Sequence, residues 1–327
     1  MSKILGIGNA LVDILTGIGS DEILDRLRLP KGSMTLVDSF RSIELREATK
    51  KYRKSIASGG SAANTIHGLG KLGTLSGYIG STGKDETGDF FEKDMQDAGV
   101  KTYLIRRDTE TGTAIALITP DSERTFATHL GAAIELTGDD LNSDQFDDYD
   151  LLYLEGYLIN NKELVEKACD LARKAGMEIA LDLASYNVVE THLEDFSYII
   201  SKYVDILFAN EEEARAYTGL DTEKAMEKIS EQVQITVIKT GSQGSLVKRK
   251  EELIKIDAVP VKCVDTTGAG DLYAAGFLYG YLNDQPLSKC GAMGSLLASN
   301  VIDLMGARIP DSRWPEIKKK VSDIINR

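Results

Sequence analysis

The stretch DTTGAGD, residues 265–271, combines small residues with one carboxylate in a pattern that suits phosphoryl transfer. Gly268, Ala269 and Gly270 are expected to present backbone N–H groups at the start of a helix, where unpaired N–H groups and the helix dipole favour an anion. Such an anion hole stabilises a transferring phosphoryl group. Asp271, in the first helical turn, could then accept the proton of an attacking hydroxyl as a general base. The alternative is an ordinary glycine-rich helix start, and the full seven-residue run favours catalysis.

A second pair of polar residues, Asn210 and Glu213, follows a predicted strand at the start of a helix. Ligands of α/β sheets bind at the carboxyl ends of the strands, and residues three apart on a helix share one face. Oxygen atoms placed there suit Mg²⁺, held through water because Mg²⁺ loses its hydration shell reluctantly. The pair therefore predicts a magnesium site at Glu213.

Near the N-terminus, Asn9 and Asp13 offer an amide and a carboxylate that suit a vicinal diol. We expect both on one face of a single strand, because side chains alternate along a strand. Gly59 and Gly60 would let a substrate approach the backbone closely, and Asn64 can both donate and accept hydrogen bonds. The alternatives are a strand-end aspartate and a simple turn before a helix that Ser61 caps.

Two familiar nucleotide motifs are absent from this sequence. The nearest match to a P-loop, GYIGSTGKD, has one residue too many and an aspartate after the lysine. The stretch GIGNAL ends in leucine where a dinucleotide-binding fingerprint needs glycine. These failures argue against a P-loop NTPase and against a nicotinamide-dependent dehydrogenase.

The elements that must position these residues alternate between strands and helices. Apolar strand-like runs such as DLLYLEGYLI, MEIALDLA, VDILFAN and ITVIKTG are separated by amphipathic helical stretches, which predicts a mostly parallel sheet covered on both faces. The first segment, KILGIGNALVDILTGI, reads as one strand, and residues 42–57 read as a helix. Two β-rich runs around Pro120-Asp121 predict a hairpin. We interpret residues 12–40 and 108–130 as a small β lid inserted into one α/β body spanning 1–327.

Bulk composition excludes several classes of partner. The net charge of −13 argues against broad surfaces for nucleic acid or an anionic membrane. No run reaches the ~20 apolar residues of a membrane span. The three cysteines are scattered and show no metal-binding spacing, which is typical of free thiols in a reducing compartment. The expected location is the cytoplasm, and the expected partner is a small molecule.

The motif DTTGAGD resembles the C-terminal signature of the ribokinase-like (PfkB) kinases, and the resemblance covers the whole chain. GIGNALVDI resembles the family's N-terminal substrate strand, SGGSAANT its Gly-Gly substrate motif, and NEEE and KTGSQGS its nucleotide-side motifs. More narrowly, KGSMTLVD, YLEGYL and DILFANE look like those of the bacterial adenosine kinases of the family. The fold that this implies is a three-layer α/β/α fold with an inserted lid.

The resemblance also implies an activity: ATP-dependent phosphorylation of the 5′-hydroxyl of adenosine to AMP, with Mg²⁺. It places Arg124 near the phosphates, on the lid. It indicates the carbonyls of Asp265 and Thr267 as candidate ligands of a monovalent cation such as K⁺, and it leaves open whether such a cation activates the enzyme. The nucleotide-binding residues that it implies are Asn210, Thr240, Gly241, Gly244 and Asn300.

Two other functions stay open at this point. A sugar kinase of the same family would act on ribose, fructose or a related acid, and a catalytically inactive nucleotide or sugar sensor would bind without turnover. The motifs at the substrate end contain no basic residue, which disfavours a sugar phosphate. Whether the chain is a monomer or a homodimer is not determined by these patterns.

Overall fold

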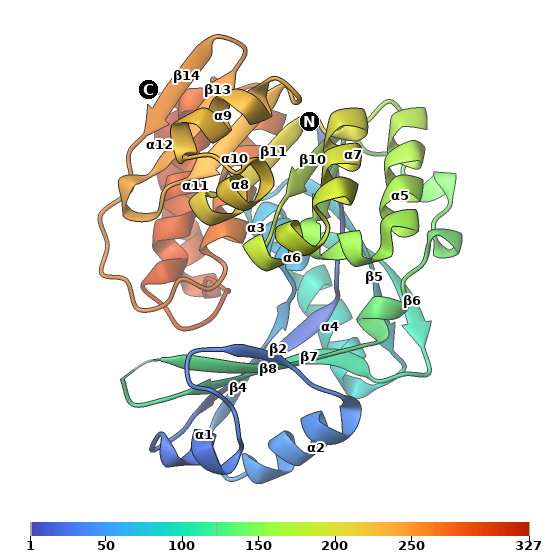
Figure 1. Cartoon of the computed structure of the whole chain (residues 1–327), viewed down its shortest axis with the longest axis vertical. Helices are drawn as coiled ribbons and strands as arrows, with labels where there is room; N and C mark the ends of the chain where they lie inside the picture. The colour runs from blue at the N-terminus through green and yellow to red at the C-terminus, as the bar shows by residue number, and fades with distance from the viewer. Residues whose placement is uncertain (1, 122, 327) are drawn as a thin grey trace.

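The computed structural model describes residues 2–121 and 123–326 and contains two sheets (Figure 1). The larger sheet has nine strands in the order β14-β13-β12-β11-β10-β9-β1-β5-β6. Its seven strands from β12 to β6 pair in parallel, and β13 and β14 add an antiparallel edge. The strands of this sheet are β1 (Lys3–Ile7), β5 (Leu75–Gly83), β6 (Val100–Arg107), β9 (Leu151–Glu155), β10 (Glu178–Asp182), β11 (Ile206–Asn210), β12 (Ile235–Lys239), β13 (Ser245–Arg249) and β14 (Glu252–Ile256).

Helices cover both faces of the large sheet, as near-continuous apolar strands require. One group of helices packs on one face: α3 (Ser61–Leu72), α4 (Glu86–Asp97), α10 (Ala269–Leu282), α11 (Leu287–Ile302) and α12 (Trp314–Asn326). A second group packs on the opposite face: α5 (Lys162–Lys174), α6 (Tyr186–Thr191), α7 (Leu193–Tyr203), α8 (Glu211–Thr218) and α9 (Thr222–Ser230). The predicted three-layer α/β/α architecture is therefore confirmed. None of the described helices is long and apolar enough to cross a membrane.

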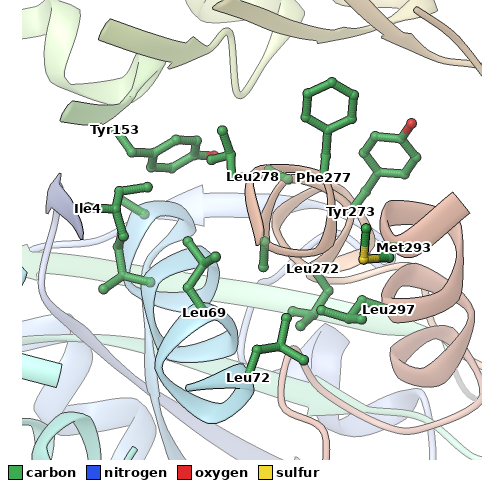
Figure 2. Close-up of a cluster of buried hydrophobic side chains, with 14 of the residues drawn as sticks. Ile4, Leu69, Leu72, Tyr153, Leu272, Tyr273, Phe277, Leu278, Met293 and Leu297 are labelled. Atoms are coloured by element: carbon green, nitrogen blue, oxygen red, sulfur yellow. The ribbon is translucent and has the colours of Figure 1, made fainter. Parts of the chain in front are cut away.

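The core on the α10 side fixes the helix that carries the candidate base. Figure 2 shows side chains from α3, α10 and α11 packed together beneath the sheet. Helices α3 and α10 approach closely because Gly68 faces Ala275, where an added Cβ would lie 3.0 Å from the alanine methyl. Phe277 is fully buried and packs edge-on against Phe208 of β11. Because this packing is tight, the N-terminal turn of α10 has a fixed position relative to the strand ends.

The second sheet, which we name the lid sheet, has five strands in the order β3-β8-β7-β2-β4. These strands are β2 (Leu11–Gly17), β3 (Met34–Leu36), β4 (Lys54–Gly59), β7 (Thr111–Ile118) and β8 (Arg124–Gly131). Figure 1 shows it below the body, with α1 (Glu22–Arg26) and α2 (Ser39–Ala48) on its outer side. These helices bury the outward-facing Ile14, Leu117 and Ala127, so the alternate residues face the body.

The structure corrects three element predictions. The first segment is not one strand: β1 joins the body and β2 joins the lid sheet, with a break at residues 8–10. The predicted helix at 42–57 ends at Ala48, and β4 follows, so the lid sheet extends beyond the predicted limit of residue 40. Ser61 is the first helical residue rather than the cap, because Gly60 is the N-cap with φ +100°.

Candidate active site

Asp271 lies in the first turn of α10, where two side chains of α3 bind its carboxylate. Ser61 Oγ donates to one oxygen at 2.7 Å, and Asn64 Nδ2 donates to the other at 2.8 Å. Burial raises the pKa of Asp271 to about 6, against the lowering effect of these two hydrogen bonds. A carboxylate with this pKa is ionised at neutral pH yet more basic than a free aspartate, which suits a general base.

The backbone at the start of α10 forms part of the predicted anion hole. Gly268 is the N-cap with φ +75°, a conformation that favours glycine, and an added Cβ would lie 2.6 Å from the Cβ of Ala307. The N–H of Ala269 is already used, because it donates to the carbonyl of Thr266 at 3.1 Å. Among the described residues, the N–H groups of Gly268, Gly270 and Asp271 make no hydrogen bond. The structure therefore leaves three free donors for an anion, and Ala269 is not one of them.

Polar residues stand at the carboxyl ends of four consecutive parallel strands, all facing the same region. They are Glu155 of β9, Asp182 of β10, Asn210 of β11 and Lys239 of β12. The register pairs Glu155 with Asp182 and Asn210 with Lys239, while Asp182 lies opposite Phe208, so the four residues form two pairs offset by two residues along this edge of the sheet. This is where α/β sheets bind ligands.

Glu155 is a buried acid that the sequence patterns did not identify. It accepts hydrogen bonds from the N–H of Asn9 at 2.9 Å, from Asn9 Nδ2 at 2.6 Å and from the N–H of Ala62 at 2.8 Å. Burial raises the pKa of Glu155 to about 7 despite these donors. Glu155 thus joins the connection between β1 and β2 to the start of α3, both of which border the site.

The expected relation between Asn9 and Asp13 is wrong. Asn9 lies in the break between β1 and β2 and is held by Glu155, whereas Asp13 lies in the lid sheet. Asp13 makes no hydrogen bond to any described residue, and burial raises its pKa to about 6, with opposing attraction from Arg308. Its carboxylate is therefore available to a ligand without Asn9.

The paired glycines make room for protein groups rather than only for a substrate. A Cβ on Gly59 would lie 2.5 Å from an Asp13 oxygen, and one on Gly60 would lie 2.0 Å from the Asn9 carbonyl. Asn64 supplies the polar contact instead: its Nδ2 holds Asp271, and its buried Oδ1 has no partner in the described part of the chain. A buried acceptor without a donor is costly, so a substrate hydroxyl would satisfy it.

Asn210 and Glu213 form a capping box at the start of α8. Asn210 Oδ1 accepts from the N–H of Glu213 at 2.8 Å, and the Glu213 carboxylate accepts from the N–H and the amide of Asn210. Burial raises the pKa of Glu213 to about 7, and Lys239 opposes this rise. These hydrogen bonds give Asn210 and Glu213 a structural role as the N-terminal cap of α8. The role of Glu213 at Mg²⁺ stays a prediction.

A cavity of about 430 Å³ opens beside the anion hole, and its wall is mainly apolar. Gly241 and Gly244 line it, as predicted for nucleotide contacts, together with Lys239, Ala269 and Gly270. Three predicted nucleotide-binding residues do not, and Asn210 is one of them. Thr240 is not in the wall. Asn300 lies on another face of α11, where its side-chain amide donates to the Leu296 carbonyl. The residues of α11 that line the cavity are Ser295, Ala298, Ser299 and Ile302. Helical periodicity explains this correction, since residues 295, 298, 299 and 302 share one face.

Arg124 ties the lid sheet to the anion-hole loop. Its guanidinium pairs with Asp265 at 2.5 Å and donates to Thr267 Oγ1 at 3.1 Å, and its side chain is only 8% exposed. Asp265 also accepts from the N–H groups of Thr267 and Gly306. Arg124 is therefore a buried link to the phosphate side of the site. The K⁺ site on the carbonyls of Asp265 and Thr267 stays a prediction.

Arg308 is another residue that the sequence patterns missed. Its Nε donates to the Ser58 carbonyl at 2.8 Å, next to the Gly59-Gly60 pair, and its charge acts on Asp13 and Asp271. Burial lowers the pKa of Arg308 to about 10, so it remains a cation. No motif flanks Arg308, and only the fold shows that it faces the site.

The sequence profile of the pfkB family carbohydrate kinases matches residues 38–314, and the chain belongs to this family. Its members are phosphotransferases that act on hydroxyl groups of sugars or nucleosides. The architecture described above is the ribokinase-like fold of the family.

Individual relatives fall into two substrate groups. A probable sugar kinase from Rhizobium etli has a solved structure with TM-score 0.89 and 32% identity, covering 99% of each chain. An adenosine kinase from Sinorhizobium meliloti has a TM-score of 0.87 and 33% identity, covering 98% of this chain and 99% of that one. A 5-dehydro-2-deoxygluconokinase from Listeria monocytogenes is 29% identical over 78% of this chain and 83% of its own length.

Proposed function

We propose that this kinase transfers the γ-phosphoryl group of ATP to the 5′-hydroxyl of adenosine, giving AMP and ADP. The observation that carries the kinase chemistry is Asp271 beside free N–H groups at the start of α10, with its pKa raised to about 6. The bond between the hydroxyl oxygen and the γ-phosphorus forms as the β–γ bridging bond breaks. The bridging electron pair leaves with ADP, and Asp271 takes the hydroxyl proton.

The α10 amides would receive the charge that develops on the phosphoryl oxygens, because Gly268, Gly270 and Asp271 keep free N–H donors. The apolar cavity beside Gly270 has the size and character of a site for the nucleotide base. The acceptor would lie between α3 and the lid sheet, where Asn64 Oδ1 and Asp13 offer unused oxygens. Asp271 then lies beside the acceptor hydroxyl, which must face the γ-phosphorus directly for an in-line transfer.

The carboxylate of Glu213, near the nucleotide cavity, suits Mg²⁺. Glu213 is buried, and its pKa is raised to about 7, first by burial and also by the charge of Asp182, which is itself paired with Lys239. Oxygen donors of this kind would hold the ion through water together with ATP phosphates. When bound, it supplies positive charge that neutralises those phosphates.

The choice of adenosine over a sugar rests on the resemblance of motifs and on the similarity to the Sinorhizobium meliloti adenosine kinase. The inner face of the lid sheet also supports it. Leu15, Ala116 and Ile118 form an apolar cluster there, packed with Phe126. An apolar wall beside the acceptor suits a flat base better than a small polyol. The sugar-kinase alternative stays open because two of the relatives carry sugar-kinase names.

The test of this function is a comparison of kcat/KM on one preparation for adenosine, inosine, ribose, fructose and 5-dehydro-2-deoxygluconate, with ADP release as the common readout. We expect adenosine to give the highest value. A higher value for any sugar or sugar acid would replace the nucleoside assignment while leaving the kinase chemistry intact. If none of the five acceptors supports ATP turnover, the proposed substrate is contradicted.

The lid sheet is expected to close over the acceptor and exclude water from the transfer. Adenosine binding should therefore slow amide hydrogen exchange in β7 and β8, whose inner faces line the acceptor side. Exchange measured by mass spectrometry with and without adenosine checks this. Strand β14, at the far edge of the large sheet, serves as the internal control and should be unchanged. Equal exchange in β7 and β8 under both conditions would contradict closure.

A further inference from the structure

Lys239, at the carboxyl end of β12, lies in the nucleotide cavity wall beside the first turn of α10. Its side chain is 15% exposed and lines the apolar cavity beside the anion hole. A Cβ on Gly270 would lie 3.0 Å from Lys239 Nζ, so the ammonium reaches the first turn of α10. The glycine at position 270 thus leaves room for this lysine.

The ammonium of Lys239 has one acid partner and two further acids nearby. Nζ donates to Asp182 Oδ2 at 2.7 Å, and the charges of Glu213 and Asp271 also act on it. Burial by itself lowers the pKa of Lys239, but these three carboxylates outweigh it and hold the pKa above its ordinary value. Lys239 therefore stays cationic, and its remaining N–H bonds are not used by described residues.

The other two buried cations near the site lie elsewhere. Arg124 comes from the lid sheet and is committed to Asp265 and Thr267. Arg308 is bonded to Ser58, which is in β4 of the lid sheet. Of the three, only Lys239 lines the nucleotide cavity.

We propose that Lys239 is a catalytic residue that contacts the γ-phosphoryl group of ATP during transfer, with Asp182 holding its ammonium in place. This proposal rests on the proposed kinase function and adds a residue to it. A fixed cation beside the free N–H groups would stabilise the charge that spreads over the phosphoryl oxygens. The ion pair with Asp182 also orients the ammonium before ATP binds, so little reorganisation is needed.

Substituting Lys239→Met should lower kcat by roughly 100-fold, the cost of removing one preorganised donor from such a site. It should also weaken ATP binding while leaving ADP binding nearly unchanged, because ADP lacks the γ-phosphoryl group. Both affinities are measured by calorimetry with excess Mg²⁺ and no acceptor. The matched control is Lys248→Met on the adjacent strand β13, where a lysine of similar exposure pairs with Glu227. That variant should keep wild-type turnover and the wild-type ratio of ATP to ADP affinity.

The single variant leaves Asp182 buried without its partner, and that charge could repel ATP by itself. The double variant Lys239→Met/Asp182→Asn removes both charges and so leaves no unpaired buried charge to destabilise the fold. We expect the double variant to keep a low kcat and to bind ATP no more tightly than it binds ADP. Recovery of wild-type turnover or of the ATP preference in the double variant would overturn the proposal, because the unpaired aspartate would then explain the loss.

Lys239→Arg keeps the charge with a different shape and should recover part of the ATP preference. An ATP-to-ADP affinity ratio in Lys239→Met equal to that of the wild type would also overturn the proposal. The binding readout separates this proposal from the proposed function. If the wild-type protein phosphorylates none of the acceptors, the substrate assignment fails, and the affinity ratio still decides the role of Lys239.

Discussion

Replacing Asp271 by asparagine is expected to lower kcat for adenosine by roughly 10²–10⁴-fold, the usual contribution of a general base. Asparagine has nearly the same shape but cannot accept the proton of the 5′-hydroxyl. ATP affinity should change little, because the free N–H groups of Gly268 and Gly270 remain. Pre-steady-state and steady-state turnover of the purified variant, with ATP binding measured separately, checks this prediction.

The matched control keeps the base and removes one of its hydrogen bonds. Ser61→Ala deletes a donor at 2.7 Å that lowers the pKa of Asp271. The pKa of Asp271 should therefore rise, and the acidic limb of the kcat/KM profile, expected near pH 6 in the wild type, should move to higher pH. At pH 8 the Ser61 variant should lose far less activity than Asp271→Asn. Near-normal kcat in Asp271→Asn would contradict the assignment of the base.

The second large effect concerns the sugar hydroxyls of the acceptor. Asp13 has no hydrogen-bond partner among the described residues, so a ligand hydroxyl would be the donor that satisfies it. A site built to bind a hydroxyl rejects analogues that lack it, because its own polar groups are then left unpaired. We expect kcat/KM for 2′-deoxyadenosine to fall below that for adenosine, with discrimination approaching ~10⁴-fold at its upper limit.

Asp13→Ala should remove much of that discrimination, because the group that detects the missing hydroxyl is gone. The ratio of kcat/KM for adenosine to that for inosine provides the control, since these nucleosides differ only in the base. That ratio should be the same in Asp13→Ala and in the wild type. Full retention of the preference for adenosine over 2′-deoxyadenosine in Asp13→Ala would show that another residue contacts the 2′-hydroxyl.

Much of the architecture was predictable because its signals are local in the sequence. Apolar runs separated by amphipathic segments predicted the parallel sheet and its two helical layers, and the structure confirms both. The start of α10 at Ala269 was also predictable, since small residues followed by a helical pattern specify a helix N-terminus. The assignment of Asp271 as base needs only that local geometry and stays a prediction until it is tested.

Tertiary structure decided which sheet each strand joined, because hydrophobic alternation does not encode a strand's partner. Residues 3–18 read as one strand, yet β1 pairs with β5 and β9 in the body while β2 pairs with β4 and β7 in the lid sheet. That division separated Asn9 from Asp13. The same ambiguity hid β4, whose exposed residues resemble the end of a polar helix.

The sequence by itself was enough to identify the site residues whose role depends on neighbours along the chain, such as the glycines and aspartate of DTTGAGD. Glu155, Lys239 and Arg308 acquire theirs only from the fold. Glu155 lies in YLEGYL and Lys239 in KTGSQGS, but neither stretch gives these side chains a role, and no motif contains Arg308. Parallel pairing places the ends of β9 to β12 along one edge of the sheet, with neighbouring strands about 5 Å apart. This register, together with the packing of α3 on α10, brings charges from distant segments close enough to change each other's pKa.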